Sequence, residues 1–304
     1  MIAFLIGRIV QGALVLLGVS LIVFALSYLG GDPAAALLPL NTAPEDVEAF
    51  RHSAGFDQPL PAQYARFLAH ALSGDFGQSL RYREPAMPLV LARLPLTVVL
   101  ALLGLAVALG VAAPLGIISA LRPGSWLDRL ARAGLLAGQS VPSFWLATVL
   151  ILVFGVGLRW LPTSGLDVPS GLVLPALTIG VFPAATLGRL LRARLREVLR
   201  ADYIRTAHAK GLSEWFVFWR HATRNVALPL VTMVALQLGT LLGGALIAEA
   251  VFALPGMGRL ALQAISARDV PLIQAFVFVS ASCVGVSNVL LDGAYTWLDP
   301  RIAL

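Results

Sequence analysis

The chain alternates long, uncharged apolar stretches with short segments that carry its charge. A helix needs about 20 mostly apolar residues to cross the hydrocarbon core of a bilayer. Six stretches without Asp, Glu, Lys or Arg reach that length: 9–31, 94–121, 133–158, 168–188, 225–248 and 270–291. The pattern therefore predicts an all-α integral membrane protein with six transmembrane helices.

The composition agrees with a membrane protein. Hydrophobic residues make up 58% of the 304 residues, charged residues 12%, and the mean hydropathy is +0.85, whereas an ordinary globular domain carries about 25% charge. The net charge of +6 is explained by basic residues beside membrane spans, so we expect membrane lipid and no nucleic acid as a partner. The single cysteine, Cys283, excludes an intrachain disulfide.

Basic residues indicate how the spans are oriented. With six spans both termini lie on one side of the membrane, together with segments 122–132 and 189–224, and this side carries 14 Lys and Arg against 8 on the other. Five of those 8 lie in 32–93, and a segment of about 60 residues or more contributes little to orientation. Because cytoplasmic loops carry the excess of Lys and Arg, both termini are predicted to be cytoplasmic.

We divide the chain into three parts. Residues 1–31 form the N-terminus and first transmembrane helix, 32–93 an external region, and 94–304 a core transmembrane domain that includes a cytoplasmic loop, 189–229. The first apolar stretch exceeds the roughly 7 to 15 apolar residues of a signal peptide, so we predict that it is retained; cleavage after 34–36 is the alternative. Within the external region the pattern predicts two helices, at 44–53 and 61–72.

Proline and glycine mark special positions in the spans. Pro142, in the run QSVPSFW, is predicted to bend the third span, because a proline removes a helical hydrogen bond. Gly239, Gly243 and Gly244 predict that the fifth span packs closely against another helix.

The loop 189–229 is basic and helical in pattern. Nine of the chain's 22 basic residues lie in 189–224, against three acidic residues. Asp202 is predicted to cap a short helix that ends at Lys210, with Gly211 as the residue at the turn. Ser213 is predicted to cap the next helix.

That next helix would present an aromatic stripe. Spacing places these side chains on one face: Trp215, Phe218, Trp219 and Ala222. A bent, basic projection edged by aromatic rings suits docking to another protein. Ordinary positive-inside charge and interfacial aromatic residues explain the same composition, so composition alone leaves both interpretations open.

The order of residues favours docking. The runs DYIRTAHAKGL and RHATRNVALP resemble the cytoplasmic "EAA-type" loop of permease subunits in ATP-binding-cassette importers, specifically the inner-membrane, B-type permeases of the oligopeptide, dipeptide and nickel family. The external runs FDQPLPAQYARFL and SGDFGQSL, the run LPTSG and the ending LDPRIAL are similar to the same family. The resemblance therefore extends over nearly the whole chain.

The resemblance implies a type I importer permease in the bacterial inner membrane, forming half of a translocation pathway for di- or oligopeptides. It implies as partners a second homologous permease subunit, two ATP-binding subunits or domains, and an extracytoplasmic substrate-binding protein. The residues that it assigns to coupling with the ATPase are Asp202, Tyr203, Arg205, Thr206, Ala207, Lys210 and Gly211.

The chain departs from the family pattern at several positions. Arg205, Thr206 and Ala207 stand where the general motif has Glu-Ala-Ala, and His208 stands where Arg or Lys is expected. Pro229 follows Gly211 by 18 residues, which is longer than the general spacing but typical of the peptide branch. These departures put single contacts in doubt and leave the docking assignment intact.

Glu249 lies at the outer edge of the fifth span, before the run AVFALPGMG. A carboxylate at this depth is a candidate external gate or pairing residue. The simpler interpretation is that it marks the membrane interface.

Catalytic chemistry is not expected in this chain. A phosphate-binding loop requires a lysine followed by Ser or Thr, and the only lysine, Lys210, is followed by Gly211. The four histidines have no metal-binding spacing, so we expect no catalytic, metal or cofactor-binding residues and no enzymatic activity. The competing class is a secondary transporter or channel subunit, which usually places ionisable residues in mid-membrane; none of the six stretches contains one.

Overall fold

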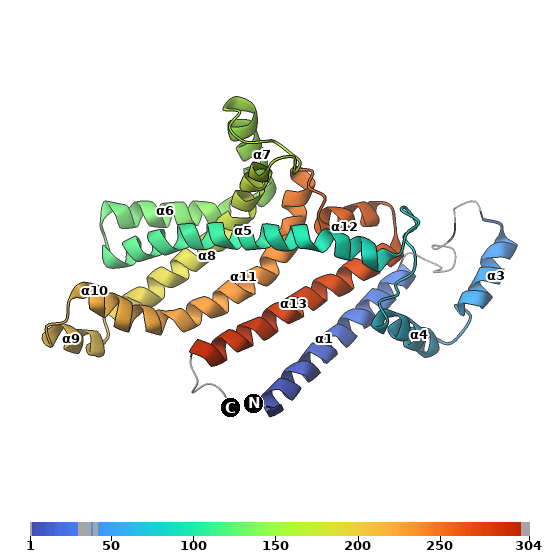
Figure 1. Ribbon diagram of the computed structural model, residues 1–304, viewed down its shortest axis with the longest axis horizontal. Coiled ribbons are helices and arrows are strands. Elements are labelled where there is room, and N and C mark those ends of the chain that lie inside the picture. The colour runs from blue at the N-terminus through green and yellow to red at the C-terminus, as the bar shows by residue number, and fades with distance from the viewer. Residues whose placement is uncertain (1, 30–37, 39–41, 299–304) are drawn as a thin grey trace. The chain divides into compact units, whose positions relative to one another are not determined.

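The computed structural model describes residues 2–29, 38 and 42–298 and is built from helices, with no strand among these residues (Figure 1). The chain divides into two compact units. The first contains residues 97–254 and 286–298, and the second contains residues 2–96 and 255–285. Helices α5 (Ala86–Leu121) and α13 (Val270–Leu298) contribute to both.

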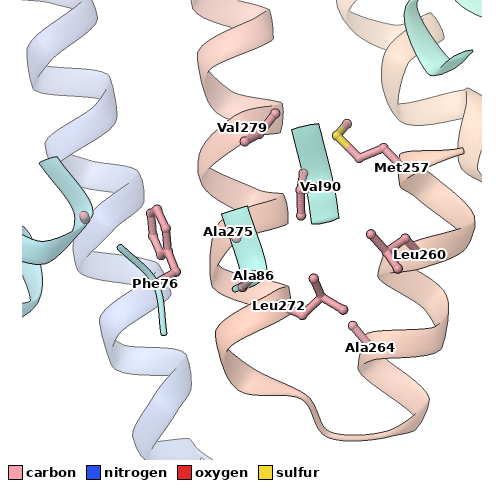
Figure 2. Packing of buried hydrophobic residues seen from close by; sticks show 10 residues of the cluster. Phe76, Ala86, Val90, Met257, Leu260, Ala264, Leu272, Ala275 and Val279 are labelled. Atoms are coloured by element: carbon pink, nitrogen blue, oxygen red, sulfur yellow. The ribbon is translucent and has the colours of Figure 1, made fainter. Parts of the chain in front are cut away.

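The second unit combines the N-terminal part of the chain with the segment before the last span. Besides parts of α5 and α13 it contains α1 (Ile2–Leu29), α3 (Pro44–Ala54), α4 (Leu60–Leu72) and α12 (Met257–Ser266). Figure 2 shows buried apolar side chains from three helices: Ala86 and Val90 of α5, Met257, Leu260 and Ala264 of α12, and Leu272, Ala275 and Val279 of α13. The two helices predicted at 44–53 and 61–72 are confirmed near their predicted bounds, whereas α12 was not predicted.

The first unit contains the remaining helices. After α5 come α6 (Trp126–Ser140), α7 (Ser143–Leu150) with a π-helical continuation η1 (Ile151–Gly157), the short 3-10 helix η2 (Pro169–Leu172) and α8 (Val173–Leu199). They are followed by α9 (Asp202–Ala209), α10 (Glu214–Val217), the π-helical turn η3 (Phe218–Ala222) and α11 (Thr223–Val251). Several of these helices extend well beyond the predicted spans.

Four helical segments of the described chain are long and apolar enough to cross a membrane: 86–121, 169–199, 214–251 and 270–289. A fifth span is added if α6 with α7 and η1 counts as one broken helix, and α1 contains a shorter apolar stretch, Val10–Ala25. Within the described residues each of the six predicted stretches contains helix, while the count of six spans stays a prediction.

The break between α6 and α7 bears out the bend predicted at Pro142. The two helical parts meet at 106°, and Val141 and Pro142 both have extended backbone angles. Pro142 serves as the N-cap of α7, so its missing N–H leaves no hydrogen bond unmade within the helix.

Loops predicted on the same side of the membrane contact each other within each unit. Asp128 and Arg192, from the two predicted cytoplasmic loops, form an ion pair with a separation of 3.1 Å between the Arg192 Nε and Asp128 Oδ1 atoms. The Ser79 hydroxyl, in the predicted external region, donates a hydrogen bond to the carboxylate of Asp269, which precedes the last span. These contacts agree with an even number of spans between the paired loops.

The fifth predicted span packs against α8, but this packing does not depend on Gly243 or Gly244. A Cβ atom added at Gly243 or Gly244 meets nothing within 4 Å in the described chain, so the close packing expected of these two glycines is not made there. At Gly180 of α8 an added Cβ would lie 2.7 Å from the carbonyl oxygen of Gly104 on α5. The sequence pattern missed this contact because it cannot tell which face of an apolar helix meets a neighbour.

Replacing Gly180 by Ala should therefore destabilise the fold. Overpacking a close contact costs about 1–3 kcal/mol, and the backbone oxygen of Gly104 cannot move aside as a flexible side chain would. Gly110→Ala is a matched control on α5, because its added Cβ meets nothing within 4 Å; it should gain about 0.5–1 kcal/mol of helix stability. Thermal unfolding of the purified chain in detergent measures both, and equal midpoints would contradict the close approach.

Candidate functional site

Helix α9 carries most of the residues predicted to couple transport to ATP hydrolysis, and it projects with α10 at the end of the first unit where α8 and α11 meet (Figure 1). One face of α9 is buried: Ile204 and Ala207 form a small apolar cluster with Val217 of α10. The cluster fixes which side of this short helix is turned outward.

Gly211 closes α9 in the predicted way. Its φ angle is +78°, in the left-handed region that favours glycine. The Gly211 N–H donates to the carbonyl oxygen of His208 and the Leu212 N–H to that of Ala207, at N···O distances of 2.9 and 3.3 Å. These bonds satisfy carbonyl groups that the end of the helix would otherwise leave unpaired.

The cap predicted at Asp202 is wrong, whereas the cap at Ser213 is confirmed. Ala201 occupies the N-cap position of α9 and Asp202 is the first helical residue, with no side-chain capping bond at this end. The Asp202 carboxylate lies instead 3.7 Å from the Arg205 guanidinium. Asp202 still suits the first turn, because a negative charge is favourable near a helix N-terminus.

Most of the predicted coupling residues face solvent. Those exposed on the outer side of α9 and its turn are Asp202, Tyr203, Arg205, Thr206, Lys210 and Gly211. Ala207 is buried and packs inside the loop. The outer surface therefore mixes both signs of charge on a short helix whose inner surface is fixed.

A polar contact that was not predicted links α9 to α11. The Asn225 side-chain amide donates to the Tyr203 hydroxyl at 3.1 Å and to the carbonyl oxygen of His221 at 2.8 Å. The pKa of Tyr203 is raised, because partial loss of water around its hydroxyl outweighs the hydrogen bond from Asn225, which lowers the pKa. The two residues are 22 positions apart, and no sequence signal pairs them.

The aromatic stripe after Gly211 divides into two parts. Trp215 and Trp219 are exposed and their rings stack edge to face, with centroids 5.4 Å apart. Ala222 is buried in an apolar cluster with Ala120, Leu195 and Val226, against which Phe218 packs. The helical segment continues from Glu214 to Val251, so the predicted short helix is the first part of the fifth predicted span.

Glu249 lies near the C-terminal end of α11 and is fully buried. Its carboxylate accepts a hydrogen bond from the Thr97 hydroxyl of α5 at 2.6 Å. The Leu254 N–H donates to the Glu249 carbonyl oxygen, which holds the turn that follows α11. Glu249 thus links two helices of the first unit rather than facing solvent.

Across the described ranges no cluster of His, Cys, Asp and Glu side chains could hold a metal ion. Residues 112–304 match the family of binding-protein-dependent transport system inner membrane components, and residues 1–101 match the N-terminal family of the same components. The chain belongs to this family.

This permease is similar over its full length to several relatives. It is 38% identical to a putative peptide transport system permease protein of Brucella abortus, 35% to the oligopeptide transport system permease protein AppB of Bacillus subtilis, and 34% to the dipeptide transport system permease protein DppB of Alkalihalophilus pseudofirmus. Each match covers 99% of both chains. The permease is therefore a multi-pass inner-membrane subunit of an ATP-binding-cassette importer.

Solved structures agree on the fold. The permease resembles a chain of the inward-facing MetNI methionine ABC transporter with a TM-score of 0.60 at 18% sequence identity, covering 70% of this chain and 97% of that one. A second MetNI crystal form gives a TM-score of 0.59 at 20% identity, with 71% and 99% covered. At this identity the likeness extends to the fold alone.

Shortening Ile204 should loosen α9 without touching its outer surface. Ile204→Ala removes most of the apolar contact with Val217, and core truncations of this kind cost about 2–5 kcal/mol. Amide hydrogen exchange over residues 204–209 should become faster. Arg205→Ala is the matched control, because the Arg205 side chain is 80% exposed; if both variants exchange alike, the cluster does not hold α9.

Proposed function

We propose that this permease forms half of the pathway by which an importer moves di- or oligopeptides into the cell. Support comes from its full-length similarity to relatives named as peptide, oligopeptide and dipeptide permeases. A second homologous permease chain supplies the other half. Two ATP-binding subunits or domains supply the energy, and an extracytoplasmic binding protein delivers the peptide.

The segment from Asp202 to Gly211 is the element that docks on an ATP-binding subunit. The observation that carries this assignment is the two-sided structure of α9: Ile204 and Ala207 are packed against Val217, while charged residues on the other side are free to meet a partner. A short helix without buried side-chain contacts would deform when a partner moved against it. A helix held by buried contacts transmits that displacement to the helices it packs on.

Displacement of α9 can reach the membrane by two connections. At its N-terminal end α9 follows α8 after Arg200 and Ala201. At the other end α10 and η3 lead directly into α11, and the Asn225 amide ties Tyr203 to the start of α11. Apolar packing of Leu195 with Ala222 and Val226 joins α8 to the same region, so both helices would move with α9.

The transmembrane organisation follows the sequence-based division. We place six spans in the inner membrane with both termini in the cytoplasm, and keep 1–31, 32–93 and 94–304 as N-terminal, external and core parts. The contacts of Asp128 with Arg192 and of Ser79 with Asp269 support the pairing of loops on each side.

Glu249 acts as an external gate in this scheme. Its buried carboxylate accepts a hydrogen bond from Thr97, which joins the outer ends of α11 and α5. A buried polar contact of this kind is costly to leave unmade. Arrangements of α5 and α11 that keep this contact are therefore favoured over arrangements that break it.

Gly211→Val tests the coupling assignment. An added Cβ at Gly211 meets nothing within 4 Å, so the variant strains only the left-handed backbone, by about 1–2 kcal/mol. Peptide uptake and ATP hydrolysis stimulated by loaded binding protein are measured in vesicles containing the complete complex. We expect normal assembly and a lower uptake per ATP hydrolysed.

Two comparisons sharpen this test. Gly74→Val is the matched control, since Gly74 has a φ of +77° and an equally open surrounding, but lies in the external region. Charge reversal at Arg205 should have a milder effect, because an exposed ion pair is worth at most about 1 kcal/mol. Parent-like coupling in an assembled Gly211→Val complex would contradict the assignment.

A further inference from the structure

A buried carboxylate lies at the cytoplasmic end of the first unit, outside the loop assigned above. Asp128, in the first turn of α6, is 1% exposed. Its carboxylate accepts hydrogen bonds from the Ser119 hydroxyl of α5 and from the backbone N–H of Gly124 at 3.0 Å. A charged group so far from water must be matched by partners on several sides.

The cationic partner comes from α8. Arg192 Nε lies 3.1 Å from Asp128 Oδ1 and 2.7 Å from the Ser119 hydroxyl oxygen, and Arg192 Nη2 lies 3.4 Å from Asp128 Oδ2. Arg132 adds a contact from within α6 itself, with its Nε atom 3.3 Å from Asp128 Oδ1. The guanidinium thus contacts both carboxylate oxygens and the hydroxyl, and joins three helices at one point.

The network lies where a movement of α9 can be transmitted through α8 to α5 and α6. Arg192 lies on α8 between the membrane span and α9, which begins at Asp202. Asp128 lies on α6, which leads through the break at Pro142 into α7. A displacement of α9 that moves α8 must therefore either break the ion pair or carry the ends of α5 and α6 along.

A buried ion pair is weak evidence for stability alone, since well-packed apolar residues often serve equally well. The ion pair does fix the relative orientation of the helices that carry it, because the planar guanidinium and the carboxylate hold each other in one orientation. The surrounding apolar contacts already pack α5, α8 and α11 together through Ala120, Leu195 and Val226. Helix α6 also packs against α8, where Leu135 lies close to Gly188. The polar network adds a contact at the first turn of α6.

We propose that Asp128 and Arg192 are positioning residues for energy coupling, and that their ion pair makes the cytoplasmic ends of α5, α6 and α8 move as one body when α9 is displaced. The proposal rests on the coupling function assigned to α9. It extends the connection through α8 from the docking loop to the broken helix α6–α7.

The test separates coupling from simple stability by removing both charges at once. Asp128→Asn combined with Arg192→Gln keeps hydrogen-bonding groups at both positions. It leaves only Arg132 without its carboxylate partner, and the Arg132 side chain is 46% exposed. Arg192→Lys is the conservative variant, since lysine keeps the charge but not the planar fork. Arg129→Gln is the matched control, because Arg129 is an exposed neighbour on α6.

Each variant is assembled into the complete complex and reconstituted in vesicles, and peptide imported per ATP hydrolysed is measured with loaded binding protein. We expect the neutral pair to assemble and its ratio to fall about tenfold, a typical size for coupling between two sites. Arg192→Lys should show a smaller fall, and Arg129→Gln none.

A neutral pair that assembles and keeps the parent ratio would overturn the proposal, since the ion pair would then be only a structural contact. If the neutral pair does not assemble, Arg192→Lys decides by the same ratio. Failure of both to assemble would also overturn it, because the pair would then serve folding. Gly211→Val is run alongside: if it keeps the parent ratio, or the parent imports no peptide, the proposed function itself fails.

Discussion

The packing of Ile204 and Ala207 against Val217 is the contact on which the functional interpretation depends. A helix as short as α9 has little stability of its own, because helix nucleation is costly and few bonds repay it. Burial of one face and the left-handed turn at Gly211 give it a fixed orientation. That orientation turns Arg205 and Lys210 outward on a segment that would otherwise fray.

The membrane imposes a different constraint on the long apolar helices. In hydrocarbon every backbone polar group must find a partner within the protein, so spans are helical and interruptions must be protected. The chain places its main interruption at Pro142. Two of its buried acidic side chains lie near helix ends: Asp128 of α6 is bound by Arg192 of α8, and Glu249 of α11 accepts a hydrogen bond from Thr97 of α5. These polar contacts thus join neighbouring helices near their ends.

The sequence was sufficient for features that depend on local chemistry. Charge-free length located the helices, proline located the break at Pro142, and Ser213 and Gly211 were identified from residue types that suit one end of a helix. The family itself was evident from ordered motifs, which preserve more information than composition does.

Features that depend on distant contacts were not predictable. Asp202 is a good cap in isolation, yet the chain begins α9 one residue earlier and leaves Asp202 in the first turn. Gly243 and Gly180 look alike in an apolar stretch, but only Gly180 faces a neighbouring backbone within the described chain. The pairing of Tyr203 with Asn225 requires the three-dimensional path of the chain, and so does the pairing of Asp128 with Arg192.

The most direct measurement of the central claim is photo-cross-linking from α9 in the complete complex. A benzophenone side chain replaces Arg205, on the outer face, and in a separate variant replaces Leu72, which is 76% exposed at the end of α4. On illumination of membranes, the account predicts a cross-link from position 205 to the ATP-binding subunit and none to that subunit from position 72. The account would be contradicted if position 205 formed no such cross-link in a complex that still hydrolyses ATP in response to loaded binding protein.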